Sequence, residues 1–276
     1  MAKIDHVLKL YAETIRSPYL HYGLWDNPEM VDVESTTLSE IRDAQERYIV
    51  LLADLIPDSV KTILDVGCGI GGNTAFLREG GFEVEALSPD SYQEELFHQK
   101  FDSEITFHKT RFETFETQEK YDLILMSESA AYIRIRPGLK KAWHLLSMGG
   151  YWLVSDYFII SSDGGDSPHL KSAHSLDCYL EAAQSAGFDL FNERDTTENV
   201  MPTLDAAYHF YNRFILPVAD YASHSVTRNA PKLSKLFKLV YGKTIRRKMT
   251  QVDYLKSSEF RKYRKYMVLL FQKGER

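Results

Sequence analysis

The sequence predicts an α/β fold, in which a mostly parallel sheet of seven strands carries helices on both faces. From Lys61 onward, short apolar runs of strand type alternate with stretches of helical periodicity, which is typical of βαβ units. A glycine-rich turn, residues 67–72, follows the first apolar run and precedes a helical stretch. Helices are expected before the sheet, and a helical segment is expected to be inserted before its last strand.

The N-terminal part, residues 1–57, is expected to lie outside the sheet. Apolar positions over residues 4–16 suit a short helix. Residues 17–26 (SPYLHYGLWD) are rich in aromatic side chains and should be irregular. Thr37 and Glu40 then form a capping box, which predicts a helix of about 20 residues.

The periodicity also places the strands and helices of the sheet region. Strands are expected over residues 62–66, 82–87, 104–109, 121–126, 150–160, 188–194 and 263–272. Helices are expected between them over residues 73–80, 90–100, 136–146 and 174–186.

The connection before the last strand is long. It holds about 65 residues of helical character, too many for a plain connection in a compact domain. We therefore expect three parts: the N-terminal helices and aromatic segment (1–57), a core built on the sheet (58–195 with 262–276), and a helical lid or substrate-binding insertion (196–261).

Composition restricts the class of protein. The chain has 276 residues, of which 44% are hydrophobic and 26% charged, as in ordinary globular proteins. A net charge of -6 argues against nucleic acid as a partner, because nucleic-acid-binding surfaces are basic. The two cysteines, Cys68 and Cys178, lack the spacing of a metal site, so no metal is expected. Since no signal peptide or long apolar run is visible, we expect a cytoplasmic enzyme.

Residues 63–72 are the most informative segment, and they read Ile-Leu-Asp-Val-Gly-Cys-Gly-Ile-Gly-Gly. Glycines let a backbone approach a ligand closely, and the helix expected after them would present free N–H groups to that ligand. Asp65 places a carboxylate at the end of the strand. A carboxylate there repels phosphates and suits a ligand that is cationic or rich in hydroxyl groups.

Two nucleotide-binding motifs fit this loop. Three of its glycines match G-x-G-x-x-G, the dinucleotide fingerprint, which also requires an acidic residue about 20 positions further on. The second strand ends at Ser88, which is not acidic. The pattern Asp-x-Gly-x-Gly-x-Gly fits instead at Asp65, Gly67, Gly69 and Gly71. It resembles the first motif of class I S-adenosylmethionine-dependent methyltransferases, with a Rossmann-like sheet. We prefer this interpretation, and a nicotinamide- or flavin-dependent oxidoreductase is the alternative.

Three further stretches carry a finer resemblance. Residues 19–25 read Tyr-Leu-His-Tyr-Gly-Leu-Trp, residues 88–93 read SPDSYQ and residues 126–132 read MSESAAY. Together they resemble the small-molecule branch of the class, which includes γ-tocopherol, sarcosine/dimethylglycine and cyclopropane-synthase-type enzymes. The resemblance covers residues 60–195 and 263–272, and it implies S-adenosyl-L-methionine as the cofactor.

The resemblance also implies where this cofactor would bind. The backbone of Gly67 and Gly69 would contact its methionine portion and ribose, and Asp65 would orient the loop. Ser88 stands where many relatives have an acidic residue for the ribose, and Gln93 could supply the missing hydrogen bond. The complete expected set for the cofactor is Tyr22, Asp65, Gly67, Cys68, Gly69, Gly71, Ser88, Pro89, Gln93, Arg111, Phe112 and Ser127.

The adenine end departs from the family pattern. Thr110 stands where relatives have an acidic residue for the adenine amine. The backbone of Arg111 and Phe112, with the ring of Phe112, is expected to hold the adenine instead. Ser127, at the end of the fourth strand, should face the methionine end and the substrate.

Two residues are candidates for the catalytic base, which is needed only if the acceptor arrives protonated. These are Glu128, just past a buried parallel strand, and His21 in the aromatic segment. The alternative for Glu128 is a hydrogen bond to loop amides. The alternative for His21 is an imidazole hydrogen-bonded within the N-terminal segment. Positioning of the acceptor by the protein can itself contribute about 7–11 kcal/mol.

Aromatic residues are expected around the acceptor, which we take to be a small molecule methylated on nitrogen, oxygen or carbon. Trp25 and Tyr132 could form the wall, and Tyr208 and Tyr211 could line the lid, with simple packing onto the sheet as the alternative. Cyclopropane-type enzymes have Glu-His where this chain has Ala131-Tyr132, which argues against cyclopropanation.

Three further questions stay open: contact with a membrane, the type of reaction and the oligomeric state. Residues 232–248 (KLSKLFKLVYGKTIRRK) carry seven basic residues among apolar ones. They could contact a membrane surface, although a solvated helix face is the preferred interpretation. The chain could also be a relative that binds the cofactor without transferring methyl. A monomer and a homodimer are both compatible with the sequence.

Overall fold

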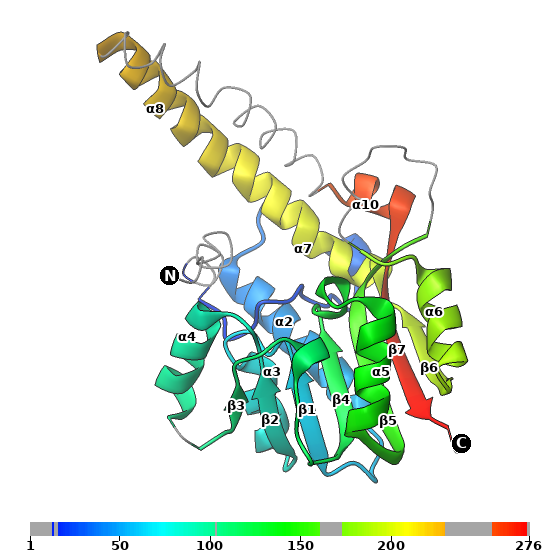
Figure 1. Ribbon diagram of the computed structural model, residues 1–276. Helices are drawn as coiled ribbons and strands as arrows, with labels where there is room; N and C mark the ends of the chain where they lie inside the picture. Colours follow the sequence, from blue (N-terminus) through cyan, green and yellow to red (C-terminus); the bar gives the residue numbers. More distant parts are fainter. Residues whose placement is uncertain (1–12, 14–15, 103, 161–172, 230–255, 275–276) are drawn as a thin grey trace.

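Seven strands form one sheet in the part of the chain that this computed structural model describes (Figure 1). The described residues are 13, 16–102, 104–160, 173–229 and 256–274. Neighbouring strands are parallel except around β7, which runs antiparallel to β5 and β6. The prediction of a mostly parallel seven-stranded sheet is confirmed. In spatial order the strands are β3 (Phe107–His108), β2 (Glu83–Leu87), β1 (Thr62–Val66), β4 (Tyr121–Ser127), β5 (Leu146–Ile159), β7 (Arg264–Lys273) and β6 (Phe188–Asp195).

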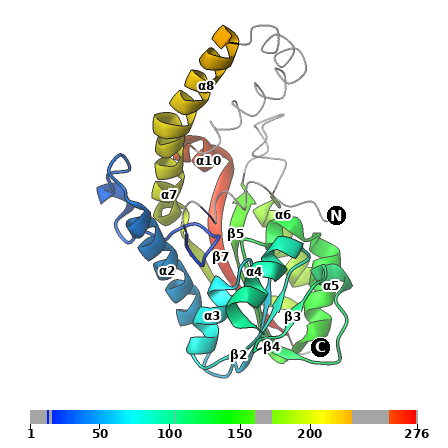
Figure 2. The ribbon, with the colours of Figure 1, turned by 90° about the vertical axis from the view of Figure 1, so that its left-hand side faces the viewer.

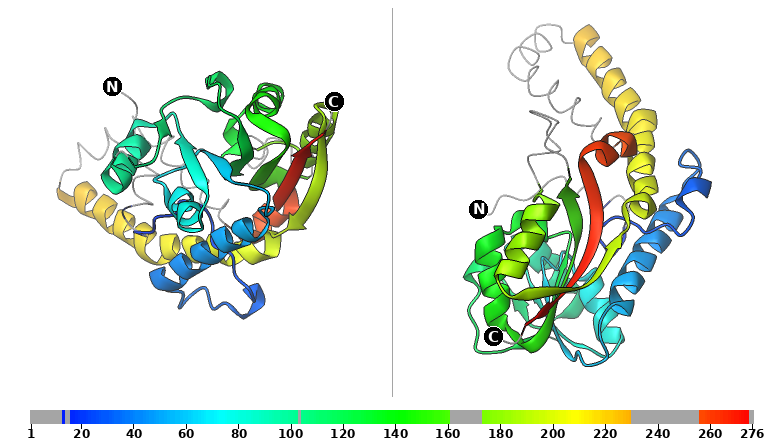
Figure 3. Two further views of the ribbon diagram at one scale, coloured as in Figure 1. Left: turned by 90° about the horizontal axis from the view of Figure 1, so that it is seen from below. Right: turned by 90° about the vertical axis from the view of Figure 1, so that its right-hand side faces the viewer.

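Helices cover both faces of the sheet, as predicted. The helices α2, α3, α7 and α10 pack on one face, and α5 and α6 pack on the other (Figure 3). Successive side chains of a strand point to opposite faces, so Ile63 and Leu64 of β1 are both fully buried. The bounds are α2 (Leu38–Asp54), α3 (Gly72–Glu79), α4 (Ser91–Phe101), α5 (Ile135–Leu145), α6 (Leu176–Ser185), α7 (Thr197–Phe210) and α10 (Ser257–Tyr263).

Two strands differ from their predicted bounds by more than one residue. The edge strand β3 has two residues instead of the expected 104–109, because β2 pairs with it at only two positions. Strand β5 begins at Leu146, before the expected start at residue 150, and its pairing with β4 shifts register after Tyr121.

The irregular segment after Arg16 is held against the carboxyl ends of the strands by α2. The capping box at the start of α2 is present, since Thr37 accepts a hydrogen bond from the Glu40 amide and the Glu40 carboxylate accepts one from the Thr37 amide. Further along α2, Gln45 Nε2 donates to the carbonyl oxygens of Tyr19 (3.3 Å) and His21 (2.6 Å). These bonds fix the part of the segment that reaches the site. The helix expected over residues 4–16 lies almost entirely outside the described residues.

The connection between β6 and β7 begins inside the core. The first turns of α7 bury Val200, Met201 and Leu204 against the same face as α2. The helix then continues through a π-helical turn, η5 (Tyr211–Ile215), into α8 (Leu216–Asn229), which projects away from the sheet (Figures 1 and 2).

Residues 211–229, which form η5 and α8, are largely exposed. The packing of the first turns of α7 onto the sheet therefore does not extend to α8. The basic stretch 232–248 lies outside the described residues. Within the described ranges, none of the helices combines the length and the hydrophobicity that a membrane crossing requires.

Candidate active site

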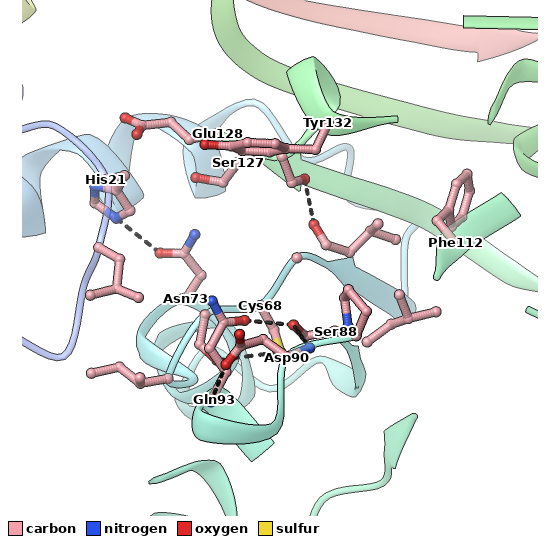
Figure 4. Close-up of a pocket in the computed structure, with 18 of the residues that line it drawn as sticks. His21, Cys68, Asn73, Ser88, Asp90, Gln93, Phe112, Ser127, Glu128 and Tyr132 are labelled. Carbon is pink, nitrogen blue, oxygen red and sulfur yellow. Dashed lines mark hydrogen bonds between the residues drawn. The ribbon is translucent and has the colours of Figure 1, made fainter. Parts of the chain in front are cut away.

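A pocket of about 520 Å³ opens at the carboxyl ends of β1, β2 and β4 (Figure 4). This is where ligands bind in open α/β sheets, and the volume suits a small molecule. The N-terminal segment, the glycine loop after β1, the start of α4 and the turns after β3 and β4 all contribute to its wall.

The glycine loop forms one wall of the pocket. Gly67, Gly69 and Gly71 all have left-handed φ values, of 75°, 58° and 83°. A Cβ atom on Gly67 would lie 2.4 Å from the Cβ of Ser129, so a side chain there is excluded by sterics as well as by backbone strain. Gly67, Cys68 and Gly69, which all belong to the set expected for the cofactor, line the pocket. Gly71 does not, because it packs against the rings of Phe97 and Phe101 beneath the loop.

Asp65 supports the loop from below rather than lining the pocket. Its carboxylate is buried and accepts a hydrogen bond of 2.6 Å from the Thr74 hydroxyl, which joins the end of β1 to the first turn of α3. Burial raises the pKa of Asp65 to about 6. These contacts are consistent with the expected orientation of the loop by Asp65, although its side chain does not line the pocket.

The end of β2 presents a small hydrogen-bonded cluster. The Ser88 hydroxyl donates to Gln93 Oε1 (2.5 Å) and accepts from the Asp90 amide (3.2 Å). Asp90 Oδ1 accepts from the amides of Tyr92 and Gln93, both at 2.9 Å, and so caps α4. Ser88, Pro89 and Gln93, which belong to the set expected for the cofactor, line the pocket.

Asp90 also lines this pocket, and the sequence analysis missed it. It supplies the carboxylate that Ser88 lacks, two positions later in the chain. The available signal was an aspartate directly before a helical stretch, which is typical of an N-cap.

At the opposite end of the pocket, the wall is lined by Arg111 and Phe112, which are expected to hold the adenine, and Phe112 is buried. Glu113 lines the pocket as well and was also missed. Its side chain is only 12% exposed and lies 3.9 Å from the Arg134 guanidinium. A carboxylate is therefore present at this end, although not at Thr110, where the family pattern suggested it.

His21 lines the pocket, and both of its ring nitrogens are engaged. Nδ1 lies 2.8 Å from the carbonyl oxygen of Tyr22, and Nε2 lies 3.0 Å from the side-chain amide of Asn73. The ring stacks on Tyr48 at a centroid distance of 4.1 Å. Burial lowers the pKa of His21 to about 4. These contacts favour the alternative expectation, a structural imidazole, over a catalytic base.

Glu128 follows β4 at the mouth of the pocket, in a left-handed conformation (φ 54°) that is unusual for a residue with a side chain. Its Oε1 accepts hydrogen bonds of 2.7 Å from the Tyr22 amide and from the Tyr266 hydroxyl of β7. Burial raises the pKa of Glu128 to about 8. A carboxyl group with such a pKa can accept or release a proton near neutral pH.

Hydroxyl groups continue from Glu128 into the interior. The Tyr48 hydroxyl lies 3.0 Å from that of Tyr266 and donates to Ser155 (2.7 Å). Ser127, which lines the pocket, lies 3.2 Å from the same Tyr48 hydroxyl. This network fixes the position of the Glu128 carboxylate.

Several residues predicted for the site lie outside this pocket. Tyr22 contributes its backbone to Glu128, but it does not line the pocket. Trp25 is buried, and its indole N–H donates to Thr203 of α7 (2.9 Å). Tyr208 and Tyr211 lie on the connection, beyond the pocket wall. Of the four residues expected around the acceptor, Tyr132 lines the pocket, at its exposed rim.

Comparison with known proteins places the chain in a family. It matches the methyltransferase domain family over residues 41–196, more than half of its length. No curated protein matches the chain in sequence. Among solved structures, the chain is similar to a putative sarcosine dimethylglycine methyltransferase from Galdieria sulphuraria, with 15% identity, coverage of 98% and 99% of the two chains, and a TM-score of 0.72.

Two other solved structures are similar over nearly the whole chain. A geranyl diphosphate C-methyltransferase from Streptomyces coelicolor A3(2) has 14% identity, coverage of 98% and 94%, and a TM-score of 0.71. The [4+2]-cyclase SpnF has 15% identity, coverage of 97% and 95%, and a TM-score of 0.66. At these identities the similarity shows a shared fold.

The fold and the glycine-loop pocket define a class I methyltransferase with a Rossmann-like sheet. The chain belongs to the methyltransferase domain family. The predicted enzyme class, an S-adenosylmethionine-dependent methyltransferase, is confirmed, and the predicted cofactor with it.

Proposed function

We propose that the protein transfers the methyl group of S-adenosylmethionine to a nitrogen, oxygen or carbon atom of a small molecule. One observation carries the proposal: the glycine-loop pocket opens toward Glu128 and Tyr132, so that a donor in the pocket would meet an acceptor at this mouth.

The pocket suits the chemistry of this donor. Gly67 and Gly69 line the pocket with backbone atoms only, and a side chain at either position would narrow the pocket. The carboxylates of Asp90, Glu113 and Glu128 suit a ligand that has hydroxyl and amino groups and a positive charge. Among the described lining residues, Arg111 alone carries a positive charge. One positive charge among several carboxyl groups does not suit the negatively charged pyrophosphate of a dinucleotide. This argues against the oxidoreductase alternative.

The residues around the mouth have separate tasks. The bound donor supplies an activated methyl group on a positively charged sulfur. The glycine loop and the cluster at Ser88 and Asp90 hold the nucleoside, while Ser127 and Tyr132 border the space for the acceptor. Glu128, held by Tyr22 and Tyr266, takes the proton from an acceptor that arrives protonated.

Similar structures support the choice of a small-molecule acceptor. Two of them are named for sarcosine or dimethylglycine and for geranyl diphosphate, which differ in charge and size. We therefore propose the class of acceptor and not one compound. The lid function of residues 196–261, the division into three parts, the oligomeric state and the cytoplasmic location stay predictions.

Titration calorimetry with S-adenosylmethionine and S-adenosylhomocysteine tests the donor. Both should bind the wild type, and Gly69→Asp should abolish binding, because the new carboxylate would fill the cradle. Incubation of the protein with a methyl-labelled donor and pools of small amines, alcohols and carbon acids tests the transfer. Failure of the wild type to bind either nucleoside would contradict the proposal.

A relative that binds the donor but catalyses another reaction is the second candidate. The similarity to the [4+2]-cyclase SpnF over nearly the full length of both chains is the observation that supports it. Cofactor binding without label in any product, together with rearrangement of an unsaturated substrate, would favour this candidate over methyl transfer.

A further inference from the structure

Asn73 is a pocket residue that the sequence analysis did not single out. It is the second residue of α3, directly after the glycine loop, and it is buried. Its side-chain amide lies between the ring of His21 and the pocket (Figure 4). The end of the pocket that holds Asn73 is opposite to the end that holds Phe112.

The hydrogen bonds of His21 restrict the orientation of this amide. A carbonyl oxygen can only accept, so the contact of 2.8 Å between His21 Nδ1 and the Tyr22 carbonyl requires a proton on Nδ1. If Asn73 Oδ1 faces Nε2, as drawn in Figure 4, Nε2 needs a proton as well. The ring would then be a cation.

A cationic ring does not fit this position. His21 is 4% exposed, and its ring lies against those of Tyr19 and Tyr48. Burial lowers the pKa of His21 to about 4, so the imidazole is neutral at neutral pH. With its single proton on Nδ1, Nε2 is an acceptor and requires a donor opposite it.

Rotation of the amide by a half turn satisfies both contacts. The oxygen and nitrogen of an asparagine amide occupy equivalent positions, so the hydrogen-bond network decides which of them faces a given partner. After this rotation Asn73 Nδ2 donates to His21 Nε2, and Oδ1 faces the pocket.

We propose that Asn73 presents its carbonyl oxygen to the pocket, where it accepts a hydrogen bond from the ammonium group of the cofactor's amino-acid tail. His21 acts through Asn73 as a positioning residue, because its unprotonated Nε2 determines which end of the amide faces inward. The inference rests on the cofactor of the proposed function. It states that Asn73 is the hydrogen-bond acceptor in its contact with the cofactor's tail. An amide nitrogen at the same place would instead favour the carboxylate of the tail.

Calorimetry with two ligands tests the contact. One is S-adenosylhomocysteine, and the other is its des-amino analogue, which keeps the adenosine, the sulfur and the carboxylate. The wild type should prefer the first by a factor on the order of 10 to 100, since a hydrogen bond to a charged group is lost in the second. Asn73→Leu should remove most of this preference while leaving the affinity for the analogue nearly unchanged.

A matched control comes from the cluster at Ser88. Gln93→Leu removes an amide of similar size near the ribose end, so it should weaken both ligands equally and leave the preference intact. Unchanged affinity of the Asn73→Leu variant for the analogue also shows that the variant is folded. An undiminished preference in Asn73→Leu would overturn the inference.

Nitrogen-15 NMR of the histidine side chains provides a test that requires no ligand. His21 should give the signature of a neutral ring protonated at Nδ1 at pH 7, assigned by its disappearance in His21→Phe. A doubly protonated ring, or a proton on Nε2 alone, would contradict the orientation of Asn73. If neither nucleoside binds the wild type, the proposed function fails, and the NMR result still decides the orientation of the amide.

Discussion

The two ends of the pocket are built in different ways. At the glycine-loop end, two of the side-chain hydrogen bonds join residues that are close in sequence: Thr74 and Asp65 are nine residues apart, and Ser88 and Gln93 five. At the mouth, Glu128 is bound by Tyr22, 106 residues away, and by Tyr266, 138 residues away.

This difference separates two functions. The donor end can be assembled by one βαβ unit, and its shape is fixed by backbone conformations that only glycine adopts easily. The acceptor end requires the N-terminal segment, α2, β4 and β7 to meet. Acceptor recognition therefore depends on the complete fold, whereas the donor cradle depends on a short stretch of chain.

The largest expected effect is on the donor end. Gly67→Val would place a Cβ atom 2.4 Å from that of Ser129, in a left-handed conformation that valine avoids. We expect cofactor binding to fall below detection in calorimetry. Gly81→Ala is the control, because Gly81 is also left-handed but has open space around it and lies outside the pocket. It should lose about 1 kcal/mol of stability and retain binding.

The next prediction, for Glu128 at the mouth, distinguishes an effect on the chemical step from an effect on donor binding. Glu128→Gln keeps the size of the side chain and removes its basicity, so kcat should fall by about 10²- to 10⁴-fold if the acceptor arrives protonated. The affinity for S-adenosylhomocysteine should change little. A variant with full kcat would show that Glu128 is a structural residue, as the alternative interpretation of its sequence position allows.

A smaller effect concerns the group that tunes Glu128. The Tyr266 hydroxyl donates to the carboxylate and so opposes the rise in pKa that burial causes, and the net pKa of Glu128 is about 8. In Tyr266→Phe, the rise of kcat with pH should therefore move to higher pH, and kcat at pH 7 should fall roughly 3- to 10-fold. Tyr179→Phe, which removes a buried hydroxyl from the opposite face of the sheet, is the control and should leave the pH profile in place.

A last prediction concerns stability instead of activity. The pKa of Glu128 is raised from 4.5 to about 8 on folding, so between these pH values the folded state retains a proton that the unfolded state has lost. Stability from this group is present at low pH and is lost as pH rises toward 8. Glu128→Gln lacks this dependence. Urea unfolding should therefore show the variant gaining about 1–3 kcal/mol relative to the wild type between pH 5 and pH 8.5. If the free energies of unfolding of the two proteins changed in parallel with pH, the pKa of Glu128 would not be raised on folding.

Residues of the donor end could be predicted because their signals are local. Gly67 and Gly69 form a motif, and Ser88, Gln93, Arg111 and Phe112 follow strands whose carboxyl ends share one edge of the sheet. Asp90 and Glu113 were missed because an acidic residue before a helix or in a turn is common in any protein. Their positions in the sequence therefore gave no sign of a ligand.

Contacts between distant segments could not be predicted in this way. The fit of Trp25 to Thr203, which turns its indole away from the pocket, and the contact of Asn73 with His21 join segments far apart in the chain. No periodicity or spacing encodes either contact.

The sequence by itself determined the order of strands and helices, the glycine cradle and the class of ligand, because these depend on backbone sterics and on the period of apolar residues. Only the tertiary structure decided which side chains face the pocket and which pKa values are displaced. It brought Glu128 to Tyr266 and His21 to Asn73, and burial and hydrogen bonding in such contacts depend on all the segments that pack around them.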